Sequence, residues 1–178
     1  MNVIPPRKIM REAKKKEDEN IEFRTFLKIN ADEEELDGLF LKLHNELFSD
    51  YDCSRCRNCC KQFHGTIPEE DFEKDAGQLG MARDEFVATY LMLHEEPGEE
   101  NTFITKHKPC DFLQEDGECK LGECKPDNCK KFPYTDQPDR LQSMYSVLNA
   151  AEVCPVVFEI LERLKEEYSF RYDGKKRY

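Results

Sequence analysis

The chain has 178 residues, of which 37% are charged and 38% hydrophobic, and its formal net charge is -11. This acidic balance argues against non-specific binding to nucleic acids or to anionic membranes, because both carry negative charge themselves. The longest apolar stretches, such as residues 86–93, are far shorter than the roughly 20 residues that a membrane-spanning helix needs. The length suits one compact domain with a lean hydrophobic core.

Both ends of the chain carry basic clusters. The first lies within residues 7–16 and is followed at once by the acidic residues 17–19, and the second consists of Lys175, Lys176 and Arg177. We interpret residues 1–29 as a charged N-terminal segment and residues 171–178 as a basic tail, both exposed to solvent. The first residues lack the apolar run of a secretory signal peptide, so a cytoplasmic location is expected.

Between these ends, residues 30–170 are predicted to form a single domain that begins with a helix. Asn30 and Glu33 have the spacing of a helix N-cap with a supporting acid. Apolar residues then recur on one helical face at Leu36, Leu39, Phe40, Leu43 and Leu47. This helix ends just before the first cysteines, so it is expected to place them at one end of a packed scaffold.

Three further helices are predicted downstream. One spans about residues 68–79 and ends at Gly80, a residue type that favours the position after a helix. The next runs through residues 86–91 and continues to Pro97-Gly98, where the helical pattern stops. The last begins near Cys154-Pro155, because proline is favoured in the first helical turn.

The region between the third and the last helix has a different character. Residues 103–108 look extended, and Asp116-Gly117 is a typical hairpin turn between residues 110–113 and 119–121. A patch of two or three short strands is therefore predicted, followed by an irregular passage after Pro126. The expected fold class is mainly α with a small β-hairpin, in an irregular cysteine-cluster domain that a metal stabilises.

The cysteines are the strongest chemical signal in the sequence. Eight of the nine form two groups, and these are Cys53, Cys56, Cys59 and Cys60 in the stretch CSRCRNCC, then Cys110, Cys119, Cys124 and Cys129. Thiolates bind soft or borderline metals, and the spacing CxxC lets two sulfurs reach one ion without strain. A free cysteine behaves as a small hydrophobic residue and has no reason to cluster among polar residues. The pattern therefore predicts a metal site that joins distant segments.

The spacing leaves the identity of the metal open. Three thiols in CxxCxxC can surround one face of a 4Fe-4S cluster, with a distant cysteine completing the ligand set. The wider spacing of Cys119, Cys124 and Cys129 could instead form one half of a zinc site. Adjacent Cys59 and Cys60 cannot easily point at the same ion, so one of them either serves a second metal or packs inward.

Four stretches of the sequence together resemble a known family. They are CSRCRNCC, IPEEDFEKDAGQLGMARDEFVATYL, PCDFLQEDGECKLGECKPDNCKKFP and the pair Cys154-Pro155. In this order they resemble the YkgJ-type cysteine-cluster proteins, which are described as a zinc- or iron-chelating domain. The resemblance implies a set of chelating residues made up of Cys53, Cys56, Cys59, Cys60, Cys110, Cys119, Cys129 and Cys154. Cys124 falls at a position that the family pattern leaves free.

The expected function is that of a cytoplasmic metal-binding protein whose thiolates chelate iron, in an iron-sulfur cluster, or zinc. The same domain occurs in flagellin lysine methylases, so the resemblance favours iron and leaves open an enzyme of methyltransferase-like or redox type. A thiol-disulfide protein without metal is the third alternative. The sequence contains no Gly-rich phosphate loop, nucleophile elbow or paired-carboxylate motif, so it identifies no catalytic residue.

Overall fold

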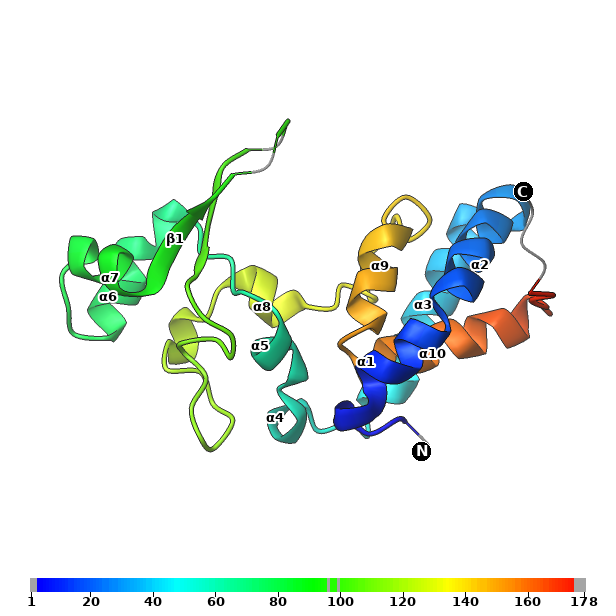
Figure 1. Cartoon of the computed structure of the whole chain (residues 1–178), viewed down its shortest axis with the longest axis horizontal. Coiled ribbons are helices and arrows are strands. Elements are labelled where there is room, and N and C mark those ends of the chain that lie inside the picture. The colour runs from blue at the N-terminus through cyan, green and yellow to red at the C-terminus, as the bar shows by residue number, and fades with distance from the viewer. Residues whose placement is uncertain (1–2, 96, 99, 175–178) are drawn as a thin grey trace. The chain divides into compact units, whose positions relative to one another are not determined.

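The computed structural model describes residues 3–95, 97–98 and 100–174, so Lys175, Lys176 and Arg177 of the predicted basic tail lie outside the described residues. It divides into two compact units (Figure 1). We call residues up to Asp52 together with those from Pro133 onward the helical unit, and Cys53–Phe132 the cysteine unit. Each is described by itself below. The predicted domain boundaries after residues 29 and 170 stay predictions.

The described residues are mainly helical, with one two-stranded antiparallel hairpin, which confirms the predicted fold class. The helices of the helical unit are α1 (Pro6–Lys15), α2 (Glu17–Asn30), α3 (Glu33–Phe48), α9 (Met144–Ala151) and α10 (Pro155–Glu167). The elements of the cysteine unit are α4 (Cys53–Cys56), α5 (Asn58–Gln62), η1 (Glu69–Asp71), α6 (Phe72–Gln78), α7 (Arg83–Tyr90), β1 (Leu91–His94), β2 (Thr102–Thr105), η2 (Gly122–Cys124) and α8 (Asp127–Lys131).

Helix α3 forms where its apolar pattern predicted it, but a different residue caps it. The side chain of Asp32 accepts a hydrogen bond of 3.0 Å from the backbone N–H of Glu35, which satisfies one of the free donors at the helix start. Asn30, the predicted cap, instead ends α2 and donates to the carbonyl oxygen of Phe26. The buried face of α3 consists of Leu36, Phe40, Leu43 and Leu47.

The N-terminal segment forms two helices with buried residues, although its charges suggested a solvated stretch. Ile9 and Ala13 of α1 and Phe23 and Leu27 of α2 are buried. A ring of four ion pairs also links α2 and its preceding residue to α10. In this ring Lys16 and the buried Lys165 each contact both Glu19 and Glu162. The many charged residues at positions 7–19 led to the prediction of a solvated segment, although the apolar residues among and after them have helical spacing.

The hairpin of the cysteine unit differs in position from the predicted one. Helix α7 ends at Tyr90, before the predicted end at Pro97-Gly98, because the next four residues form β1 and pair with β2 from Leu91↔Thr105 to His94↔Thr102. The chain around Asp116-Gly117 does turn, and in the described part of the chain one isolated bridge, Leu113↔Cys119, flanks that turn. Two backbone hydrogen bonds cross it, from the N–H of Gln114 to the carbonyl oxygen of Glu118 at 2.9 Å and from the N–H of Lys120 to that of Phe112 at 2.8 Å.

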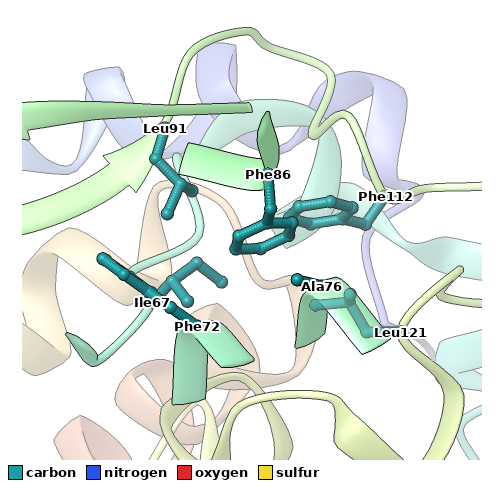
Figure 2. Close-up of a cluster of buried hydrophobic side chains, with 7 residues drawn as sticks. All are labelled: Ile67, Phe72, Ala76, Phe86, Leu91, Phe112 and Leu121. Atoms are coloured by element: carbon teal, nitrogen blue, oxygen red, sulfur yellow. The ribbon is translucent and has the colours of Figure 1, made fainter. Parts of the chain in front are cut away.

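The cysteine unit has its own apolar core beside the cysteines (Figure 2). Phe86 of α7 stacks on Phe112, with ring centroids 5.9 Å apart and planes inclined by 12°. The other buried members of this cluster are Ile67, Phe72, Ala76, Leu91 and Leu121. Cys110 and Cys119 pack against its edge, so the core fixes the segments that carry two of the thiols.

Asp75 of α6 is fully buried, and neither of its carboxylate oxygens has a hydrogen-bond partner among the described residues. Burial raises the pKa of this carboxyl group to about 6. Because the pKa in the folded state lies above its unfolded value near 4, the protonated form favours folding at low pH. That stabilisation is complete below about pH 4 and is lost as the pH rises through about 6.

Replacing Asp75 should therefore stabilise the cysteine unit at neutral pH. We expect Asp75→Asn to raise the free energy of unfolding by about 2 kcal/mol at pH 7.5 and to change it little at pH 4. Urea denaturation of wild type and variant at both pH values measures the difference. Glu73→Gln, which neutralises an exposed carboxylate on the same helix, is the control and should be nearly neutral at both. Equal stability of Asp75→Asn and wild type at pH 7.5 would contradict the expectation.

Candidate metal centre

The stretch CSRCRNCC does not form one continuous helix. Cys53–Cys56 make a single turn, α4, and Arg57 then adopts the left-handed conformation with φ of 46° before α5 begins at Asn58. A non-glycine residue rarely adopts this conformation, so the surrounding contacts must hold it there. The break changes the direction of the chain between the first two cysteines and the last two.

Four of the predicted ligands line one cavity of about 40 Å³. They are Cys60 of α5, Cys110 in the loop after β2, Cys119 after the Asp116-Gly117 turn, and Cys129 of α8. A hydrogen bond of 2.8 Å from the backbone N–H of Cys110 to the carbonyl oxygen of Cys60 ties the first two segments together. The structure thus brings one thiol of the first cysteine group to three thiols of the second, although Cys60 and Cys110 are 50 positions apart in the sequence.

Gly65 forms part of the cavity wall and keeps it open. A Cβ atom at this position would lie 3.9 Å from the Sγ atoms of both Cys110 and Cys129. The backbone here is held by Thr105, whose N–H donates to the Gly65 carbonyl at 2.8 Å and whose hydroxyl accepts from the Gly65 N–H at 2.9 Å. Any larger residue at position 65 would therefore fill space between two sulfurs.

The other predicted ligands do not line this cavity. Cys53, Cys56 and Cys59 lie on α4 and α5 outside its lining, although the sulfur of Cys59 is 4.0 Å from that of Cys60. Cys124 packs at the edge of the apolar core, and Cys154 precedes α10 in the helical unit. All nine cysteines lie in the described part of the chain, and none of them forms a disulfide there. The full ligand set that the resemblance implies stays a prediction.

The two histidines near the cysteines make contacts of other kinds. His64 hydrogen-bonds to the carbonyl oxygen of Thr105 through Nδ1, at 2.6 Å. The exposed His107 is oriented by Asp111, with 2.7 Å between Nδ1 and the carboxylate. Neither histidine lines the cavity among the described residues.

The four thiols have different pKa values. Burial raises the pKa of Cys110 and Cys119, and it raises that of Cys129 to about 11. The hydrogen bond with Cys59 and the charges of Lys125 and Arg57 together lower the pKa of Cys60 to about 6, against the opposing effect of its burial. At neutral pH the metal-free cavity thus has one thiolate and three thiols, and a metal would have to displace the three remaining protons.

The donor atoms in the cavity are of one chemical kind. Its lining contains four sulfurs and no carboxylate or imidazole among the described residues. Sulfur donors suit zinc and iron, whereas calcium and magnesium prefer oxygen. In residues 3–95, 97–98 and 100–174, however, no three His, Cys, Asp or Glu side chains stand close enough together to hold an ion as they are. The chemistry of the cavity fits a thiophilic metal, and its sulfurs would have to move closer together to bind one.

Three other residues of the lining have chemical or steric roles that sequence analysis did not identify. Arg57 and Lys125 place positive charge beside the thiols, and Gly65 supplies space. Both cations follow a cysteine directly in the sequence. The sequence therefore contained a sign that positive charge lies near the thiols. Nothing local distinguishes Gly65, because its role depends on two sulfurs that are 45 and 64 residues away in the sequence.

Comparisons with known proteins agree with this chemistry. A family model for CxxCxxCC, "Putative zinc- or iron-chelating domain", matches residues 52–155 and thus spans all nine cysteines. Neither the curated proteins nor the solved structures contain a match to the chain. Within the described residues, no helix has the length and apolar character to cross a membrane. The resemblance predicted from the sequence is confirmed, and the chain belongs to the CxxCxxCC family.

Proposed function

We propose that the protein chelates one divalent metal ion, zinc or iron, through the thiolates of Cys60, Cys110, Cys119 and Cys129. The observation that carries this proposal is that these four thiols line a single small cavity whose described lining contains no carboxylate or imidazole side chain. A bound ion would supply a covalent link among four separate segments of the cysteine unit. Four protein sulfurs leave no open coordination position, which is typical of a structural site.

The size of the cavity favours a single ion over the iron-sulfur cluster that the sequence suggests. A volume of about 40 Å³ is a few times the 10–15 Å³ that one water molecule requires. A 4Fe-4S cluster adds four irons and four sulfides, and it usually takes several ligands from one CxxCxxC segment. Among the described residues, Cys60 is the one cysteine of CSRCRNCC that lines this cavity. The cluster remains the second candidate, because the spacing of Cys53, Cys56 and Cys59 suits it.

Cysteine variants separate these two candidates. If a single ion is held by the cavity thiols, Cys60→Ser, Cys110→Ser and Cys129→Ser should each lose most of the bound metal, because a hydroxyl binds such metals poorly. Cys53→Ser and Cys56→Ser should then retain it. Metal and acid-labile sulfide per chain, measured on anaerobically purified protein, are the readout, and Cys124→Ser is the matched control outside the cavity.

Two other results would change the assignment. A brown protein with labile sulfide that loses its iron in Cys53→Ser and Cys56→Ser would favour the cluster. Full metal content in all three cavity variants would reject chelation at this site.

A further inference from the structure

Lys125 is a half-buried lysine without a carboxylate partner in the part of the chain that the structure describes. It follows η2 and lines the same cavity as the four thiols. Among the described residues no Asp or Glu pairs with it, whereas the buried Lys165 has two such partners. An ammonium group that loses part of its hydration without a counter-charge costs free energy. A compensating negative charge in the cavity would remove that cost.

Arg57 is the second cation of the cavity lining. Its side chain is 18% exposed, and its Nη2 is 3.5 Å from a carboxylate oxygen of the largely exposed Glu118. The Nε atom of Arg57 is buried and has no hydrogen-bond partner among the described residues. The guanidinium, which comes from the α4–α5 junction, therefore retains donor capacity beside the thiols.

The positive charge of the cavity lining equals the negative charge that the four thiolates would have with a divalent ion bound. A divalent ion with four thiolates carries two negative charges, and Arg57 and Lys125 together carry two positive ones. We propose that Arg57 and Lys125 are positioning residues that neutralise the tetrathiolate complex and so strengthen metal binding at the cavity. This inference rests on the proposed function. It adds that affinity depends on two cations that touch no metal and on the ionic strength of the solution.

The sharpest test removes one charge at a time. Lys125→Gln should weaken zinc binding about tenfold, because the complex loses one nearby positive charge in a partly desolvated site. Lys125→Arg should restore wild-type affinity, since it keeps the charge. Lys120→Gln is the matched control, because Lys120 is exposed, lies next to Cys119 in sequence and is outside the cavity lining. Competition with a chromophoric chelator gives the zinc dissociation constants.

Ionic strength and a cobalt spectrum distinguish charge from structure. The difference between wild type and Lys125→Gln should shrink at high salt, where Coulomb interactions are screened. The thiolate-to-cobalt absorption of the Co²⁺-loaded variant should match wild type, which would show that the four sulfurs still bind. If Lys125→Gln does not fold, Arg57→Gln and the salt dependence of wild-type affinity make the same test.

Failure of this inference is distinguishable from failure of the proposed function. Loss of zinc in Cys60→Ser together with unchanged affinity in Lys125→Gln would overturn the role of the cations and leave chelation intact. Equal weakening in Lys125→Gln and Lys120→Gln would also overturn it, because the effect would then be one of net charge. Unchanged zinc binding in Cys60→Ser would overturn both the proposed chelation at the cavity and the proposed role of the cations.

Discussion

Gly117→Ala is expected to destabilise the cysteine unit by about 3 kcal/mol. A Cβ atom at this position would lie 2.3 Å from the carbonyl oxygen of Ser54, which is closer than real atoms approach. The obstacle is backbone, so it cannot rotate away, and either the turn or α4 has to shift. The φ of 87° adds a cost of about 1 kcal/mol or more for any residue with a Cβ.

A second glycine provides the matched control for this variant. Gly98 has a φ of 88°, and a Cβ there would meet nothing within 4 Å among the described residues. Gly98→Ala should therefore show the conformational cost alone, about 1 kcal/mol. Urea denaturation of both variants separates the steric effect from the backbone effect. Equal destabilisation by the two substitutions would show that the turn does not pack closely on Ser54.

The Gly117 variant should also affect the cavity. The turn precedes Cys119, and the same hypothetical Cβ would lie 3.6 Å from the side chain of Arg57. A shift of the turn would thus move one thiol and one cation of the cavity together. Zinc affinity of Gly117→Ala, measured by chelator competition, is expected to fall, while that of Gly98→Ala should stay at the wild-type value.

The helices with regular apolar spacing could be predicted from the sequence. The buried face of α3 follows its leucines and phenylalanines, and α10 begins at Pro155 as expected. Helices α1 and α2 were hidden by dense charge, and α9 by the irregular, proline-rich stretch expected before it. The position of the hairpin was predicted wrongly, because the local sequence of Leu91–His94 suits a helix. These residues form a strand because they pair with Thr102–Thr105.

The chemistry of the site could be predicted from the sequence, but its geometry could not. Cysteine spacing indicates a metal, and the family match agrees with this. Cys60 lines the cavity and its neighbour Cys59 does not, a difference between two adjacent cysteines of α5 for which the sequence gives no clear signal. Long-range contacts such as the hydrogen bond between Cys110 and Cys60 join segments whose pairing is not encoded by local periodicity.

Metal removal is expected to loosen one part of the cysteine unit selectively. In the described part of the chain, the segments that carry the cavity thiols contain the short helices α5, η2 and α8 and the isolated bridge Leu113↔Cys119. Among the described residues, no core residue of α6 or α7 lines the cavity itself, although Phe86 of α7 stacks on Phe112, which does. Because structural zinc contributes about 10–16 kcal/mol in small metal-dependent domains, the cysteine-bearing segments should lose more order than this core.

Amide hydrogen exchange with and without a chelator measures this selective loss. The N–H groups of Cys110 and Lys120 donate to Cys60 and Phe112 at 2.8 Å each, so they report directly on the cavity segments and should exchange much faster without metal. The N–H of Phe158 in α10, which donates to Cys154, belongs to the helical unit and is the internal control. Unchanged exchange at Cys110 and Lys120 after verified metal removal would contradict a structural role. Equal loss of protection at Phe158 would instead show that metal stabilises both units, because the helical unit would then depend on a site that lies outside it.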